Sequence, residues 1–194
     1  MAEIVLFHSA LGLRPAVRSA ADRLRRAGHV VHTPDYYGGA VFDDLDDGMK
    51  YLTKMGFEEA HRRGDELVAA LAPDLVYAGF SMGASIAERL TLTRPGARAA
   101  VLLHNAEPVS DFEQATWPNA VPVQLHYASQ DPWVNAGDVA GLKSDVERAG
   151  ETLEAYSYPG GGHLFTDPGL SEYDPKSAEL LWERVLEFLE RLQG

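Results

Sequence analysis

Ser81 lies between two glycines in the stretch Gly79-Phe80-Ser81-Met82-Gly83, which matches the pattern G-x-S-x-G. An apolar run precedes the motif and a helical pattern follows it, which is the strand–turn–helix context of an exposed nucleophile. The tight turn leaves room only for glycine at its flanks, and the helix N-terminus favours negative charge that develops beside the serine. We therefore interpret Ser81 as a nucleophile. The alternative is an ordinary turn in which Ser81 caps the helix.

Two later loops carry the groups that would activate this hydroxyl. A serine is a poor nucleophile without a base, and in strand–helix proteins with this motif the acid and then the histidine follow it along the chain. Asp131 lies in SQDPWVN and His163 in PGGGHLF, each directly after a strand-like run. His163 is the candidate base, and Asp131 would orient its imidazole. The alternatives are a turn role for Asp131, a merely solvated histidine, and three rival acids: Glu107, Asp111 and Asp138.

Attack on a carbonyl also creates an oxyanion, which needs two N–H donors. The residue directly after the nucleophile, Met82, supplies the first candidate N–H. The second is expected from the loop after the first strand, HSALG, where Ala10 is the first choice and Leu11 the second. Backbone placement matters more than side-chain type at these positions.

Strand-like runs and helical patterns alternate along the chain. Strands are expected at 3–8, 29–35, 75–80, 99–105, 121–129 and 152–159. Helices are expected at 14–28, 57–72, 82–93 and 136–149, and along an apolar stripe that runs from Ala178 to Leu192. This alternation predicts one α/β domain over residues 1–194, with a mostly parallel sheet of six to seven strands and helices on both faces. The segment 38–56 is the least regular and is a candidate lid.

The composition excludes several classes of function. The chain has 194 residues, no cysteine and a net charge of −12. Cysteine chemistry is therefore excluded, and binding to nucleic acid or an anionic membrane is disfavoured. No phosphate-binding loop is present, and the calcium-like run DDLDDG lacks the required ligands. Without a signal-peptide pattern or a membrane-length apolar run, we expect a cytoplasmic monomer or homodimer that needs no cofactor or metal.

With these residues placed, the chain resembles the dienelactone hydrolase family of α/β-hydrolases. The resemblance covers nearly the whole chain and is carried by the opening that ends in TPDYYGG, and by GFSMGA, ASQDPWV and GGGHLF. It implies a sheet without a large cap domain, and a carboxylic ester hydrolase that uses a Ser81–His163–Asp131 triad.

Three positions depart from the best-known members of that family. Ser81 stands where they use cysteine, Ser9 stands where they place a glutamate in the oxyanion loop, and Asp167 stands where they carry an arginine for a substrate carboxylate. Because an aspartate cannot bind a carboxylate, we expect a neutral ester or lactone as substrate. The negative net charge favours the same class.

Several loop residues are candidates for the wall of a substrate pocket: Leu11, Tyr36, Tyr37, Met82, Trp133 and Phe165. Packing in the interior is the alternative for the aromatic members. The resemblance places Asp35 at the edge of the site, and a capping or turn role is its favoured alternative.

We interpret the protein as a serine hydrolase that cleaves small carboxylic esters or lactones through an acyl-enzyme intermediate. One alternative is a thioesterase or acyl-peptide hydrolase with the same three residues. The other is a non-catalytic protein that binds a small molecule on a hydrolase scaffold.

Overall fold

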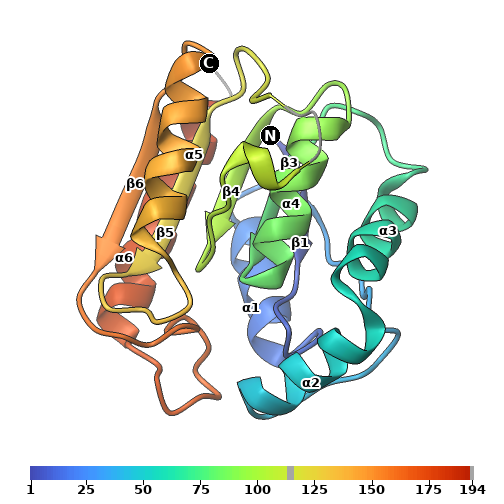
Figure 1. Ribbon diagram of the computed structural model, residues 1–194, viewed down its shortest axis with the longest axis vertical. Coiled ribbons are helices and arrows are strands. Elements are labelled where there is room, and N and C mark those ends of the chain that lie inside the picture. The colour runs from blue at the N-terminus through green and yellow to red at the C-terminus, as the bar shows by residue number, and fades with distance from the viewer. Residues whose placement is uncertain (113–115, 193–194) are drawn as a thin grey trace.

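A computed structural model describes residues 1–112 and 116–192, and one parallel sheet forms its centre (Figure 1). The strand order is β2-β1-β3-β4-β5-β6, and every neighbouring pair is parallel. The strands are β1 Glu3–Phe7, β2 Val30–His32, β3 Val76–Phe80, β4 Ala99–Leu103, β5 Val123–Ala128 and β6 Leu153–Tyr158. The predicted α/β-hydrolase sheet is therefore confirmed with six strands, and the described residues form no separate cap domain.

Helices cover both faces of the sheet (Figure 1). They are α1 Pro15–Arg26, α2 Leu45–Met55, α3 Phe57–Val68, α4 Met82–Thr93, α5 Ala136–Arg148 and α6 Pro175–Arg191, with a short 3-10 helix at Val109–Asp111. Apolar residues of α1 and α6 pack on one face, and those of α2 to α5 pack on the other. The central strands β3 and β4 are buried at every residue, as expected for strands that are covered on both faces. No helix within the described residues is long and apolar enough to span a bilayer.

The helix α2 corrects one expectation, because the segment 38–56 is more regular than its sequence indicates. Asp44 caps α2 by accepting a hydrogen bond from the Asp47 N–H at 2.9 Å. Gly48 and Leu52 are buried, and Leu45, Met49 and Met55 pack against the core from partly buried positions. A methyl group at Gly48 would overlap the carbonyl oxygen of Ala10, so α2 packs directly on the loop after β1.

The carboxyl ends of the strands bring the candidate residues to one edge of the sheet. Ser81 follows β3, His104 follows β4, Asp131 follows β5 and His163 follows β6. In a parallel sheet these ends lie side by side, so loops far apart in the sequence meet there. The chain order of the strands is the same as their order from β3 to β6 in the sheet.

A buried carboxyl group on α4 contributes a pH-dependent term to stability. Glu88 is fully buried, its Oε2 accepts from the Glu107 N–H at 3.3 Å, and its Oε1 has no partner among the described residues. Burial, followed by the negative charge of Glu107, raises the pKa of Glu88 well above the ordinary 4.5. The folded protein therefore keeps this proton at pH values where the unfolded chain has lost it.

Replacing Glu88 with glutamine is expected to stabilise the protein at neutral and higher pH. A raised folded pKa costs stability progressively as the pH rises above the unfolded pKa, and glutamine removes that cost. We expect a gain of about 1–3 kcal/mol in the free energy of unfolding at about pH 8. Little change is expected at about pH 4. Denaturant unfolding at both pH values measures this. Exposed Glu187 on α6 gives a control variant, Glu187→Gln. Parallel pH profiles for wild type and Glu88→Gln would contradict the assignment.

Candidate active site

The turn between β3 and α4 holds Ser81 in an unusual backbone conformation, with φ 51° and ψ −115°. A methyl group at Gly79 would overlap the backbone of Gly83, and one at Gly83 would overlap the carbonyl oxygens of Phe7 and His8. Both glycines are therefore required by close backbone approach, as the motif predicts. The strained serine is the type of outlier that accompanies functional sites.

Ser81, His163 and Asp131 are joined by a chain of short hydrogen bonds. Ser81 Oγ lies 2.7 Å from His163 Nε2, and His163 Nδ1 lies 2.8 Å from Asp131 Oδ2. The side chain of Asp131 is fully buried and that of His163 is 5% exposed. Because Nδ1 must donate to the carboxylate, the neutral imidazole presents a lone pair on Nε2 to the serine hydroxyl. This arrangement can remove a proton from Ser81 during nucleophilic attack.

Hydrogen bonds with Trp133 and Glu172 hold the acid and the histidine in place. Neither contact is evident from the sequence. The second oxygen of Asp131, Oδ1, accepts from the Trp133 N–H at 2.9 Å. The carboxylate of Glu172 accepts from the N–H groups of His163 at 3.2 Å and Leu164 at 2.7 Å. Glu172 therefore fixes the backbone of the histidine loop. Only the fold of residues 160–174 reveals this role, since no spacing rule connects Glu172 to His163.

The three rival acids lie elsewhere. Asp138 is in the first turn of α5, and Asp111 is in the 3-10 helix. Glu107 accepts from the hydroxyl of Ser85 and the amide of Asn105. None of the three contacts His163 in the described structure, whose Nδ1 pairs with Asp131.

The two expected oxyanion donors are free to act. Among the described residues, neither the Met82 N–H nor the Ala10 N–H has an acceptor. Leu11 differs, because its N–H donates to Ser9 Oγ at 3.1 Å. This contact argues against the second choice, Leu11, and favours Ala10. Ser9, which stands where the best-known members of the resembled family carry a glutamate, thus shapes the oxyanion loop through its hydroxyl.

Residues of the stretch TPDYYGG contact the oxyanion loop that follows β1. Tyr36 is 1% exposed, stacks on His8 at 3.8 Å between ring centroids, and donates from its hydroxyl to the His8 carbonyl at 2.9 Å. Burial lowers the pKa of His8 to about 4, so this ring is neutral at physiological pH. Asp35 accepts from the N–H groups of Tyr37 at 3.0 Å and Gly39 at 2.7 Å. The turn role for Asp35 therefore accounts for its position.

The other candidate wall residues divide into two groups. Leu11 and Trp133 line a cavity of about 220 Å³ beside His163, and the Trp133 ring lies 5.9 Å from the His163 ring. Three residues are instead packed in the interior and do not line this cavity: Tyr37, Met82 and Phe165. For Tyr36, Tyr37 and Phe165, interior packing rather than pocket wall describes the observed position.

Acidic side chains surround this cavity. Asp43, Asp44 and Glu172 line it, together with apolar side chains from four segments. Asp167, which stands in place of the expected arginine, is paired with Arg14 at 2.8 Å. Arg14 also donates to Asp43 at 3.0 Å, so its charge is already matched. The cavity therefore presents negative charge to an incoming molecule.

His104 is a further residue of the site that sequence patterns did not distinguish. It is fully buried, adopts φ 66° directly after β4, and its ring lies 6.2 Å from that of His163. Its Nε2 lies 2.9 Å from Thr166 Oγ1, three residues beyond His163. Burial lowers the pKa of His104 well below the ordinary value, so it is a neutral hydrogen-bonding group. Through this contact with Thr166, His104 links the end of β4 to the loop that carries His163.

Comparison with known proteins gives a match over almost all of the chain. The model of the dienelactone hydrolase family matches residues 1–193. A protein of Aquifex aeolicus (strain VF5), named as a candidate carboxymethylenebutenolidase, is 28% identical over 204 residues, which cover 95% of this chain and 86% of the relative. The protein usf of Aquifex pyrophilus is 25% identical, with the same coverage.

Solved structures share the fold at lower identity. A dienelactone hydrolase-like promiscuous phosphotriesterase, P91, from metagenomic libraries has a TM-score of 0.76 at 21% identity, covering 99% of this chain and 87% of that one. The esterase PE8 has a TM-score of 0.70 at 18% identity, covering 98% of this chain and 92% of that one. These likenesses establish the α/β-hydrolase fold.

Proposed function

The chain belongs to the dienelactone hydrolase family, and we propose that it cleaves small neutral carboxylic esters or lactones with Ser81 as nucleophile. Membership in this family makes it a carboxylic ester hydrolase. The proposal adds the identity of the catalytic residues and the class of substrate.

In the proposed mechanism, Ser81 Oγ attacks the carbonyl carbon while its proton passes to His163 Nε2. The tetrahedral oxyanion accepts hydrogen bonds from the N–H groups of Met82 and Ala10. His163 then gives the proton to the leaving alcohol, and the acyl group remains on Ser81. A water molecule then gives a proton to His163 Nε2 and attacks the acyl carbon; the bond from that carbon to Ser81 Oγ breaks, Oγ takes the proton back from His163, and the carboxylic acid leaves. Asp131 holds the imidazole in the required tautomer and balances its transient charge.

The observation that carries this proposal is the hydrogen-bonded chain from Asp131 through His163 to Ser81, at 2.8 Å and 2.7 Å. A serine that merely capped α4 would not require a buried histidine–carboxylate pair at its hydroxyl. Ser81 makes no side-chain capping hydrogen bond to α4, which removes the main argument for the capping alternative.

Charge around the cavity supports a neutral substrate. The carboxylates of Asp43, Asp44 and Glu172 line it, and they would repel a substrate carboxylate. The same charges disfavour the thioesterase alternative, since acyl-CoA carries several phosphate charges. Inhibition of ester hydrolysis by acyl-CoA at low ionic strength would support that alternative over a carboxylesterase.

Labelling with a fluorophosphonate tests the proposal, because such a probe reacts rapidly only with an activated serine. Intact-mass and peptide analysis of the wild type should reveal one adduct, on Ser81. The adduct should be lost in His163→Ala, which removes the base. A control variant, His61→Ala, removes a histidine that contacts Ser85 rather than Ser81 and should still be labelled.

Absence of an adduct on wild-type Ser81 would contradict the proposal and favour the non-catalytic binding protein. Equal labelling of wild type and His163→Ala would mean that His163 is not the base. The cytoplasmic location, the monomeric or dimeric state, and the expectation of a single domain stay predictions from the sequence.

A further inference from the structure

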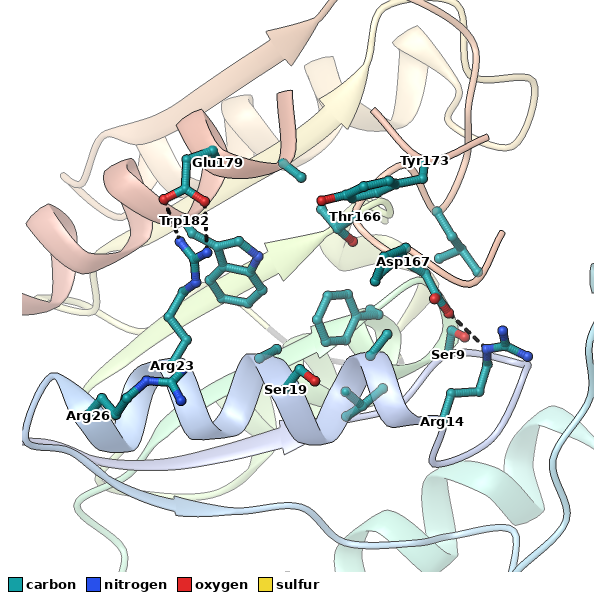
Figure 2. A pocket seen from close by; sticks show the side chains of 17 residues that line it. Ser9, Arg14, Ser19, Arg23, Arg26, Thr166, Asp167, Tyr173, Glu179 and Trp182 are labelled. Atoms are coloured by element: carbon teal, nitrogen blue, oxygen red, sulfur yellow. Dashed lines mark hydrogen bonds and ion pairs between the residues drawn. The ribbon is translucent and has the colours of Figure 1, made fainter. Parts of the chain in front are cut away.

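A second cavity lies on the other side of Leu164 from the cavity beside His163. It has a volume of about 190 Å³ and is bounded by α1 on one side and by α6 and the segment 164–173 on the other (Figure 2). Leu164 lines both cavities. Neither Ser81 nor His163 lines this second cavity, so the mechanism above does not use it.

The lining of the cavity combines aromatic and apolar side chains with polar and charged ones. The rings of Phe80 and Trp182 meet at 64° with centroids 6.2 Å apart, and Val17, Ala20 and Ala178 are among the other apolar residues of the lining. An engineered apolar cavity of about 150 Å³ is large enough to bind benzene. The volume here therefore suits one six-membered ring that carries a small substituent.

A hydrogen-bond donor of Trp182 faces into this cavity. Trp182 is 6% exposed, and its indole N–H has no acceptor within the described residues. Figure 2 shows the indole nitrogen directed toward the middle of the cavity, with the Tyr173 hydroxyl directed inward from the opposite rim. The indole nitrogen is not one of the fully buried polar atoms, so a ligand that enters the cavity can reach this N–H with an acceptor group.

One positive charge at the edge of the cavity has no counter-charge in the described part of the chain and can attract an anion. Three arginines line it against two carboxylates: Arg14, Arg23 and Arg26 against Asp167 and Glu179. Figure 2 shows both carboxylates engaged at the two ends, Asp167 by Arg14 and Glu179 by Arg23. Arg26 has no acceptor among the described residues. Because Arg14 also pairs with Asp43, Arg26 is the lining arginine whose charge has no partner in the described part of the chain, whereas acidic side chains line the cavity beside His163.

We propose that this second cavity is a binding site for a small aromatic carboxylate. The ring packs on Phe80 and Trp182, the carboxylate accepts from the Trp182 indole N–H, and Arg26 attracts the negative charge at the mouth. The site lies next to the catalytic machinery, since Phe80 precedes the nucleophile and Leu164 follows the histidine. It is nevertheless separate from the triad, and its ligand does not compete for Ser81.

Isothermal titration calorimetry with benzoate tests the proposal. Benzoate should bind wild type and Ser81→Ala with the same affinity and one-to-one stoichiometry. Benzamide has the same ring and a carbonyl acceptor but no charge, and we expect it to bind about two- to fivefold more weakly. Labelling Ser81 with the fluorophosphonate should leave benzoate binding intact.

Variants of the lining locate the bound ligand. Ala20→Phe fills the cavity and should abolish binding. Trp182→Phe keeps most of the ring but removes the donor, and should weaken binding about two- to tenfold. Arg26→Ala should weaken binding about two- to fivefold. Arg18→Ala on the same helix removes an exposed arginine that does not line the cavity, and should leave the affinity unchanged.

Three outcomes would overturn the proposal. One is no benzoate binding to wild type up to about 10 mM. Another is binding that disappears when Ser81 is blocked, which would place benzoate at the triad. The third is unchanged affinity in both Ala20→Phe and Trp182→Phe, with circular dichroism establishing that each variant is folded. The milder Trp182→Phe keeps the test decisive if Ala20→Phe does not fold.

Discussion

Replacing Ser81 with alanine is expected to reduce the hydrolysis of short acyl p-nitrophenyl esters by about 10⁶-fold in kcat. The reason is that Ser81 Oγ is the atom that forms the acyl-enzyme, and no other nucleophile lies within reach of His163 Nε2 in the described structure. The remaining rate should reflect binding and the oxyanion donors alone. A burst of p-nitrophenolate release measures formation of the acyl-enzyme, and steady-state release measures the complete turnover.

A matched control is available one turn along the same helix. Ser85 is 3% exposed and contacts His61 and Glu107 rather than the triad. Ser85→Ala should therefore change turnover far less than Ser81→Ala. Full activity in Ser81→Ala would refute the mechanism, and comparable losses in both variants would indicate damage to α4 rather than loss of a nucleophile.

Replacing Asp131 with asparagine is the second large expected effect, a decrease of about 10⁴-fold in kcat. The amide can donate a hydrogen bond to His163 Nδ1 where the carboxylate accepts one, so the imidazole would hold its proton on Nε2 and face Ser81 as a donor. Asparagine also leaves the imidazolium without a compensating charge. Substrate binding does not involve this buried group, so KM should change little. Steady-state ester hydrolysis separates the two constants.

Asp138→Asn provides the comparison, because Asp138 was a rival for the same role and lies in the first turn of α5. We expect it to retain nearly full activity. A large loss in Asp138→Asn with little loss in Asp131→Asn would show that Asp138, and not Asp131, is the acid of the triad. Thermal unfolding of both variants distinguishes a chemical effect from a loss of the fold.

Most of the fold could be predicted from the sequence because the parallel strands are covered on both faces. Such strands form short apolar runs, as in β3 and β4, and the intervening helices carry an apolar stripe. The helix α2 was missed although Leu45, Met49 and Leu52 have helical spacing and pack against the core. The acidic run DDLDDG at its start gives the segment an irregular appearance, and only the fold shows its packing against the backbone of Ala10.

The pocket wall was predicted less well than the reacting groups. Aromatic residues on loops have the same composition whether they pack inward or face a cavity, and only side-chain direction separates the two. Tyr36 packs on His8 and supports the oxyanion loop, while Trp133 stands beside His163 at the cavity. Local sequence does not encode that direction, because it follows from contacts with residues distant in the chain.

The sequence by itself determined the chemistry that is available: a serine between two glycines, an acid and a histidine after later strands, no cysteine and an excess of negative charge. These properties depend on residue type and local backbone geometry. The tertiary structure alone decided that Glu172 and His104 contact the histidine loop and that the Leu11 N–H donates to Ser9. It also decided that α1 and α6 enclose a second cavity into which the Trp182 indole N–H is directed. Each of these depends on distances between segments far apart along the chain, which only the packed sheet and its helices bring together.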